Sequence, residues 1–236
     1  IVNGVDYGEW NPSTDPHLPA HFGPDDLLGK RTCRDALLDE LGVAPEPSGP
    51  VLGIVSRLTH QKGFELIPDF AERLLDHHDM RLLVLGSGDP EQESYFRWLR
   101  DRYPAKVGVH IGYDNGLAHR IEAGSDLFLM PSRYEPCGLN QMYSLKYGTV
   151  PLVRSTGGLA DTVERLEDGR GTGFTFYEHT SVAFEDTLAH ALEVWRDPKA
   201  WQQMQLRGMA KDFSWEVQVD RYEDLYAAIM ADLQLA

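Results

Sequence analysis

An alternation of apolar runs and helical patterns is the feature that most constrains this chain. Five times between residues 51 and 163, a short apolar run leads into a polar, glycine-containing loop and then into a helical pattern. The first run is apolar throughout, which is typical of a strand buried on both faces of a parallel sheet. The five runs are residues 51–55, 81–85, 107–111, 126–130 and 150–153, and a sixth run follows at 173–176. The sequence therefore predicts an α/β fold, a doubly wound parallel sheet of the Rossmann-like kind with right-handed crossovers.

The flanking segments differ from this central unit. Residues 1–30 are rich in Pro, Asp, Asn and Gly and predict an irregular wrapping segment, whereas residues 30–176 form the predicted Rossmann-like domain. Residues 177–236 predict C-terminal helices. Within the domain we expect one continuous helix through Leu66 and Leu74, and a later helix capped by Asn115.

The loop from Pro131 to Gln141 contains one acid, Glu135, between an apolar run and a helical pattern. Loops at the carboxyl ends of parallel strands open into the crevice where such sheets bind ligands. Pro136 stiffens the backbone beside Glu135, and Gly138 allows close approach of a ligand. A plain acid at a helix N-terminus explains Glu135 equally well, so this loop alone leaves both interpretations open.

Two cations follow the first predicted strand. Arg57 and Lys62 are five positions apart across a loop, so both side chains can converge on one anion such as a diphosphate. The alternative is a pair of solvated surface cations. Thr156 with Gly157-Gly158, before a short helix, offers a second place where phosphate or sugar oxygens can bind, although a tight turn needs the same residues.

Two further side chains have competing explanations. Tyr113 follows the third strand and can stack on a nucleobase or simply pack locally. Cys137 lies where a helix dipole favours the thiolate, but a small residue required for fit is the simpler explanation.

Composition excludes several classes of function. Thirty-seven acids against 22 Lys and Arg give a formal charge of −15, which argues against a nucleic-acid or anionic-membrane surface. The two cysteines suggest neither a disulfide framework nor a zinc site, and the nine histidines form no ligand cluster, so no metal is assigned. Gly86-Ser87-Gly88 lacks the third glycine of a dinucleotide fingerprint, which disfavours NAD. We expect no cofactor and a reduced cytoplasmic setting.

Several motifs together resemble the bacterial glycogen synthases and plant starch synthases. In chain order they are Asn3 to Asp6, Ser56 to Gly63, Gly112 to Asp114, Pro131 to Leu139, Thr156 to Val163 and Asp212 to Trp215. The likeness covers essentially the whole chain. It implies the C-terminal, donor-binding half of a two-domain GT-B glycosyltransferase, and a location in the bacterial cytoplasm, or in the plastid stroma if the source is a plant.

That resemblance implies transfer of glucose from ADP-glucose to the non-reducing end of an α-1,4-glucan with retention of configuration. It implies that Arg57 and Lys62 neutralise the diphosphate leaving group and that Glu135 acts on the glucose, more by binding and orientation than by assisting an oxocarbenium ion. It also implies donor contacts by a second group of residues: Tyr113 near adenine, Cys137, Gly138 and Leu139 at the glucose, and Thr156, Gly157 and Gly158 by the phosphates.

The chain departs from related families at one position. Those families carry a second acid eight residues after the first, and here that residue is Tyr143, which weakens any two-carboxylate mechanism. The N-terminal half, which would bind most of the glucan acceptor, is not in this sequence, so we expect no glucan elongation by the chain alone. The last helix is expected to pack toward that half. The alternatives are a non-catalytic nucleotide-sugar-binding module and a related GT-B enzyme with another donor.

Overall fold

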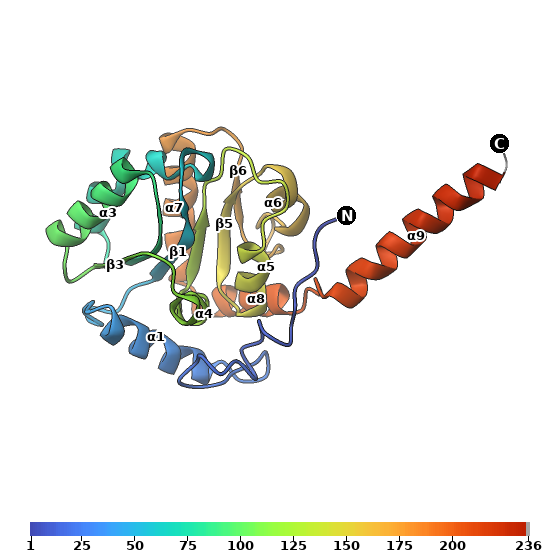
Figure 1. The fold of residues 1–236 in the computed structure, drawn as a ribbon. Helices are drawn as coiled ribbons and strands as arrows, with labels where there is room; N and C mark the ends of the chain where they lie inside the picture. The colour runs from blue at the N-terminus through green and yellow to red at the C-terminus, as the bar shows by residue number, and fades with distance from the viewer. Residues whose placement is uncertain (235–236) are drawn as a thin grey trace.

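The structure is a computed structural model that describes residues 1–234, with side chains described through residue 231. A parallel sheet of six strands forms its centre, in the order β3-β2-β1-β4-β5-β6 (Figure 1). The strands are β1 (Val51–Leu58), β2 (Arg81–Gly88), β3 (Val107–Ile111), β4 (Leu127–Met130), β5 (Val150–Arg154) and β6 (Phe174–Phe176). The predicted doubly wound, Rossmann-like fold is confirmed.

Two apolar cores cover the two faces of the sheet, because successive side chains of a strand point to opposite sides. Leu52 and Ile54 of β1 belong to one core, whereas Val51 belongs to the other. The first core is covered by α2 (Ala71–His77), α3 (Pro90–Arg102), α7 (Ser181–Trp195) and α8 (Pro198–Met209). The second is covered by α1 (Leu28–Glu40), α4 (Asn115–Gly124), α5 (Asn140–Lys146) and α6 (Gly157–Thr162).

The helix predicted through Leu66 and Leu74 is wrong as a single element. The chain forms two short 3₁₀ segments, η1 (His60–Lys62) and η2 (Phe64–Asp69), before α2 begins. Pro68 lies inside η2, and a proline ring both lacks an N–H and clashes with the carbonyl four residues before it. The backbone therefore uses shorter i to i+3 hydrogen bonds, such as Phe70 N–H to the Ile67 carbonyl at 3.2 Å.

Other predicted boundaries also shift. The cap of α4 is Asp114 rather than Asn115, and its carboxylate accepts a hydrogen bond from the Leu117 N–H at 2.8 Å. β1 continues to Leu58 because its last residues pair with Gly86 to Gly88 of β2, so residues expected in loops belong to strands. Arg57 therefore lies in β1 itself, at its carboxyl end, and not in the following loop.

The N-terminal segment is held against the second core by a buried aromatic stack. The Trp10 ring lies between those of His119 and Tyr143, with centroid distances of 3.7 and 3.8 Å. Beside it, the buried Asp15 carboxylate accepts hydrogen bonds from His119 and from the Tyr147 hydroxyl. Burial pushes the pKa of Asp15 upward, but these hydrogen bonds outweigh burial and hold that pKa below its ordinary value.

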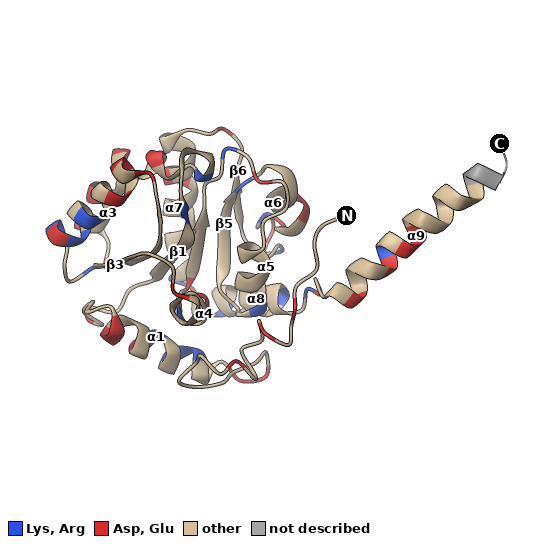
Figure 2. Ribbon diagram, in the orientation of Figure 1, with Lys and Arg blue, Asp and Glu red and all other residues tan. Residues whose placement is uncertain are grey.

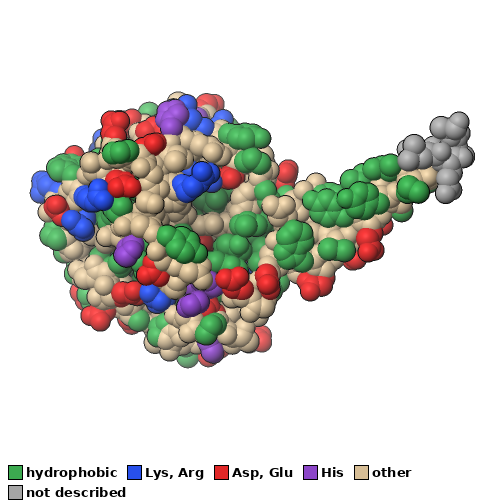
Figure 3. Space-filling view, viewed as in Figure 1, with side chains coloured by type: hydrophobic (Ala, Val, Ile, Leu, Met, Phe, Trp, Pro, Cys, Tyr) green, Lys and Arg blue, Asp and Glu red, His purple; other side chains and the backbone are tan. Residues whose placement is uncertain are grey.

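The last helix, α9 (Trp215–Gln234), projects away from the body of the molecule (Figure 1). Large apolar side chains along it are exposed, among them Leu225, Tyr226 and Met230, and Figure 3 shows such side chains gathered on its surface. Figure 2 shows that acidic and basic residues are both present on α9. That this helix packs toward another domain stays a prediction. Among the described residues, no helix is long and apolar enough to cross a membrane.

Candidate active site

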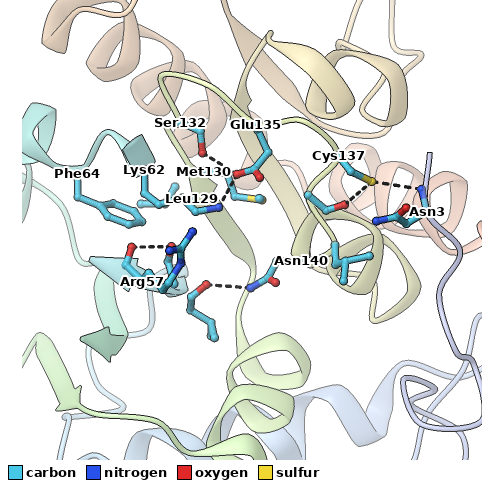
Figure 4. Close-up of a pocket in the computed structure, with 14 residues that line it drawn as sticks. Asn3, Arg57, Lys62, Phe64, Leu129, Met130, Ser132, Glu135, Cys137 and Asn140 are labelled. Atoms are coloured by element: carbon cyan, nitrogen blue, oxygen red, sulfur yellow. Dashed lines mark hydrogen bonds and ion pairs between the residues drawn. The ribbon is translucent and has the colours of Figure 1, made fainter. Parts of the chain in front are cut away.

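A cavity of about 320 Å³ opens at the carboxyl ends of β1 and β4 (Figure 4). These strands are neighbours, while β2 and β5 lie on their outer sides, so the strand order reverses between them. Such a reversal leaves a crevice because the loops after the two strands diverge to opposite faces of the sheet. The lining residues are Asn3, Val55, Ser56, Arg57, Lys62, Phe64, Leu129, Met130, Ser132, Glu135, Cys137, Gly138, Leu139 and Asn140.

An ion pair crosses this cavity. Lys62 Nζ lies 2.6 Å from Glu135 Oε2, and the two side chains are only 18% and 7% exposed. Ser132 Oγ donates to the same carboxylate oxygen at 3.2 Å. Gly63 allows this approach, because it has φ +77° and a Cβ there would lie 1.9 Å from the Pro131 carbonyl oxygen.

Arg57 adds a second cation to the cavity. Its side chain is exposed, and within the described part of the chain its guanidinium makes no hydrogen bond or ion pair. Figure 4 shows it on the same side of the cavity as Lys62. The cavity therefore offers one cation without a protein partner and one held by a carboxylate, an arrangement suited to an anion with several oxygens.

The loop that carries Glu135 is supported from behind by the start of α6. The Gly158 N–H donates to the Glu135 carbonyl at 3.0 Å. Gly157 has φ +47°, and a Cβ on it would lie 2.1 Å from that same carbonyl oxygen. The side-chain amide of Gln141, which is fully buried, donates to the carbonyls of Cys137 and Gly138. Glycine at positions 157 and 158 is therefore required for α6 to contact the loop.

The structure brings six of the ten predicted site residues into the cavity lining: Arg57, Lys62, Glu135, Cys137, Gly138 and Leu139. Thr156, Gly157 and Gly158 lie outside the lining, where the two glycines contact the back of the Glu135 loop. Tyr113 is also outside the lining, and its ring is 88% exposed. The functional roles assigned to all ten residues stay predictions.

Four polar members of the lining were not among the predicted site residues: Asn3, Ser56, Ser132 and Asn140. Ser132 could have been found, because it is part of the predicted loop. Asn140 also follows a predicted site residue, and its side-chain amide donates to the Val55 carbonyl at 2.8 Å, which ties α5 to β1. Asn3 opens one of the motifs that carry the resemblance, but no local pattern predicts its place in the cavity, because its N–H reaches Cys137 Sγ at 3.3 Å across 134 residues of sequence.

The position eight residues after Glu135 does not face the cavity. Tyr143 stacks against Trp10 of the N-terminal segment with an interplanar angle of 2°. Among the described residues, Glu135 is the only acid in the cavity lining. No group of three or more His, Cys, Asp and Glu side chains in that part of the chain is placed to hold a metal ion.

Comparison with known proteins places this geometry in a family. Residues 43–205 match the sequence profile described as Glycosyl transferases group 1. The chain belongs to this family. A Rossmann-like sheet with its cavity at the strand reversal is consistent with the C-terminal domain of a GT-B glycosyltransferase, and the predicted fold class is confirmed.

The predicted resemblance is confirmed by more specific relatives. The chain is 53% identical to the glycogen synthase of Anaeromyxobacter dehalogenans (strain 2CP-1 / ATCC BAA-258), over 97% of this chain and 48% of that protein. It is 51% identical to the glycogen synthase of Koribacter versatilis (strain Ellin345), over 96% and 47%. The catalytic domain of starch synthase IV from Arabidopsis thaliana, bound to ADP and acarbose, superimposes with a TM-score of 0.89 at 36% identity, over 97% of this chain and 48% of that one. The chain thus spans about half the length of the curated relatives it matches.

Proposed function

We propose that this chain is the donor-binding half of a glycogen synthase that transfers glucose from ADP-glucose to the non-reducing end of an α-1,4-glucan with retention of configuration. The observation that carries the proposal is the cavity at the strand reversal, where Arg57 and the Lys62–Glu135 pair face one space. The similarity to glycogen synthases, and the ADP bound in the starch synthase IV structure, support the choice of donor.

Arg57 and Lys62 would stabilise the leaving group. When the bond between the glucose C1 and the phosphate oxygen breaks, its electron pair stays on that oxygen and negative charge grows on the distal phosphate. Cations already in place stabilise this charge more in the transition state than in the ground state. Lys62 would exchange part of its contact with Glu135 for a contact with the phosphate.

Glu135 would bind and orient the glucose. Its carboxylate is the single acid in the described lining, and it is already held by Ser132 and Lys62. Carboxylate oxygens accept hydrogen bonds from sugar hydroxyls, and Cys137, Gly138 and Leu139 line the same cavity. One carboxylate can position the sugar, whereas a double displacement would require it to act as nucleophile beside a second acid.

The remaining predicted donor residues have separate roles in this proposal. Tyr113, exposed after β3, is free to stack on the adenine. Thr156 supplies a hydroxyl near the phosphates. Gly157 and Gly158 act by holding the Glu135 loop, since the Gly158 N–H already donates to the Glu135 carbonyl. We assign no cofactor and place the enzyme in the cytoplasm. Most contacts with the glucan acceptor would come from the N-terminal half of the full enzyme, and α9 would pack toward that half.

Calorimetric titration with ADP, ADP-glucose, UDP-glucose and NAD tests the proposal. We expect the adenine sugar nucleotide to bind best and an Arg57→Ala/Lys62→Ala variant to lose this binding. A glucan elongation assay, with and without the N-terminal half of a related glycogen synthase, then separates an enzyme from a binding module. Elongation only with both halves is expected. A preference for UDP-glucose, or tight binding that persists in the variant, would contradict the assigned donor site.

A further inference from the structure

A second cavity lies at the opposite, amino-terminal ends of the strands. Its volume of about 570 Å³ exceeds that of the cavity beside Glu135. It is bordered by Ser48, just before β1, and by Asp126, just before β4, so it opens at the amino ends of these strands. Helices α1 and α8 supply most of the other lining residues, and Figure 1 shows both helices at the lower end of the sheet. A ligand here would not touch the first cavity.

Cations outnumber acids in this lining, although the chain as a whole carries a charge of −15. The basic members are Lys30, Arg31, Arg34 and Arg196, and the acidic members are Asp35 and Asp126. A local excess of positive charge in an acidic protein attracts anions to that place.

Two of the four cations already have protein partners. Lys30 Nζ donates to the carbonyls of Ala123 and Tyr147 and to the Thr149 hydroxyl, and burial lowers the pKa of Lys30 to about 8. Arg34 is paired with Asp126 at 3.4 Å and also donates to the Gly49 carbonyl.

Arg31 and Arg196 differ from these two. Both side chains are exposed, and neither guanidinium makes a hydrogen bond or ion pair with any residue whose side chain the structure describes. Their guanidinium groups come from α1 and from the end of α7, so two separate elements present free donors to one cavity. Two free unit charges match a ligand that carries a double negative charge.

A buried donor in the same lining also lacks an acceptor. Trp201 is 5% exposed, and its indole Nε1 makes no hydrogen bond within the described chain. A buried N–H without an acceptor costs about 1–3 kcal/mol, so an acceptor oxygen from a ligand or water would stabilise this part of the cavity. Trp195, half-buried in the same lining, adds an apolar wall. The lining therefore offers donors and an aromatic surface to a ligand rich in acceptor oxygens.

We propose that this cavity is a second ligand site, which binds a small phosphate-bearing anion through Arg31, Arg196 and the Trp201 indole N–H. A phosphate monoester carries a charge near −2 at neutral pH and three acceptor oxygens, which matches two free guanidinium groups and one further donor. The organic part of the ester then lies against Trp195.

Titration with orthophosphate and with glycerol 2-phosphate tests this site. The Arg57→Ala/Lys62→Ala variant is the background, because phosphate bound at the first cavity would otherwise add to the signal. We expect one equivalent of each anion to bind, detected by calorimetry and by a change in tryptophan fluorescence. Adding Arg31→Glu/Arg196→Glu weakens binding by about tenfold or more, because two attractive charges become repulsive. Trp201→Phe, which removes the indole N–H, weakens it several-fold.

A matched control changes the same charge elsewhere. Arg100→Glu/Arg102→Glu on α3 lies outside the cavity lining and should leave phosphate affinity within about twofold of the background. Thermal melting of each variant checks that the chain still folds. Absence of phosphate binding to the background variant would overturn the proposal, as would equal losses from the two charge reversals. Binding of neutral maltose that is insensitive to Arg31→Glu/Arg196→Glu would instead make the cavity a carbohydrate site.

Discussion

Removing the charge of Glu135 should strengthen the binding of ADP, because Glu135 holds Lys62 in an ion pair. In the free chain, the Lys62 ammonium lies 2.6 Å from the Glu135 carboxylate, so a diphosphate must compete with that carboxylate for the same cation. Glu135→Gln keeps the shape of the side chain but removes its charge. We therefore expect this substitution to tighten the binding of ADP, although it removes a residue that we place in the site.

The magnitude follows from the burial of the pair. Exposed ion pairs contribute about 0–1 kcal/mol, and breaking fully buried ones costs about 3–5 kcal/mol. Side chains that are 18% and 7% exposed lie between these limits, at about 2 kcal/mol, which corresponds to about 30-fold in the dissociation constant of ADP. ADP-glucose should gain less, because its glucose loses an acceptor when the carboxylate becomes an amide.

A double-mutant cycle measures this effect. Calorimetric titrations of ADP at constant ionic strength compare the wild type, Glu135→Gln, Lys62→Met and the double variant. We expect Lys62→Met to weaken ADP binding and the gain from Glu135→Gln to be much smaller in that background. Glu65→Gln is the control, since Glu65 pairs with Arg133 outside the cavity lining. Weaker ADP binding by Glu135→Gln, or a coupling energy below about 0.5 kcal/mol, would refute the reasoning.

Three further predictions concern other residues. Gly157→Ala should lower the free energy of unfolding in urea by about 2 kcal/mol or more and weaken ADP binding, because its Cβ would lie 2.1 Å from the Glu135 carbonyl oxygen. The control Gly169→Ala, at φ +72° with nothing within 4 Å of the added Cβ, should lower it by about 1 kcal/mol, and equal losses would argue against the clash. Asp15→Asn should lower the free energy of unfolding by about 3 kcal/mol at pH 7. The pKa of Asp15 lies below its ordinary value in the folded chain. The stability that its carboxylate adds is therefore complete above the unfolded pKa of about 4 and is lost as the pH falls through the folded pKa. An Asp15→Asn variant whose stability falls with acid as steeply as that of the wild type would contradict this assignment. Tyr113→Ala should weaken ADP binding about tenfold without changing the melting temperature, since Tyr113 is 88% exposed. Tyr113→Phe should retain the binding, and an unchanged affinity in the alanine variant would exclude stacking.

Much of the fold could be predicted because each strand contains a short, mostly apolar run followed by a polar loop. The runs at 107–111 and 150–153 agree with β3 and β5 to within a residue. The prediction failed where tertiary pairing or a single residue decides the outcome. β1 extends through the polar Ser56 and Arg57 only because β2 pairs with them, and Pro68 breaks a pattern of apolar residues that otherwise predicts a helix.

The site was predictable to the extent that its residues follow strands. Arg57, Lys62 and Glu135 were expected at one edge of the sheet, and the parallel topology brings them into one cavity. The contact of Asn3 with Cys137 and the stack of Trp10 on Tyr143 could not be predicted, because each joins the N-terminal segment to α5 or its preceding loop through packing alone. The spacing pattern also gave no indication that Tyr113 would lie outside the lining.

The ion pair also ties ligand binding to folding of the whole sheet. Lys62 and Glu135 are 73 residues apart and belong to the two halves of the sheet that meet where β1 pairs with β4. A partly folded chain with only one half in place has no site, so a ligand of this cavity binds the fully folded state alone. At 100 times its dissociation constant, such a ligand adds about 2.7 kcal/mol to the free energy of global unfolding. Its protection against proteolysis should therefore extend to β3 and β6, the outermost strands, rather than end at the loops that it touches.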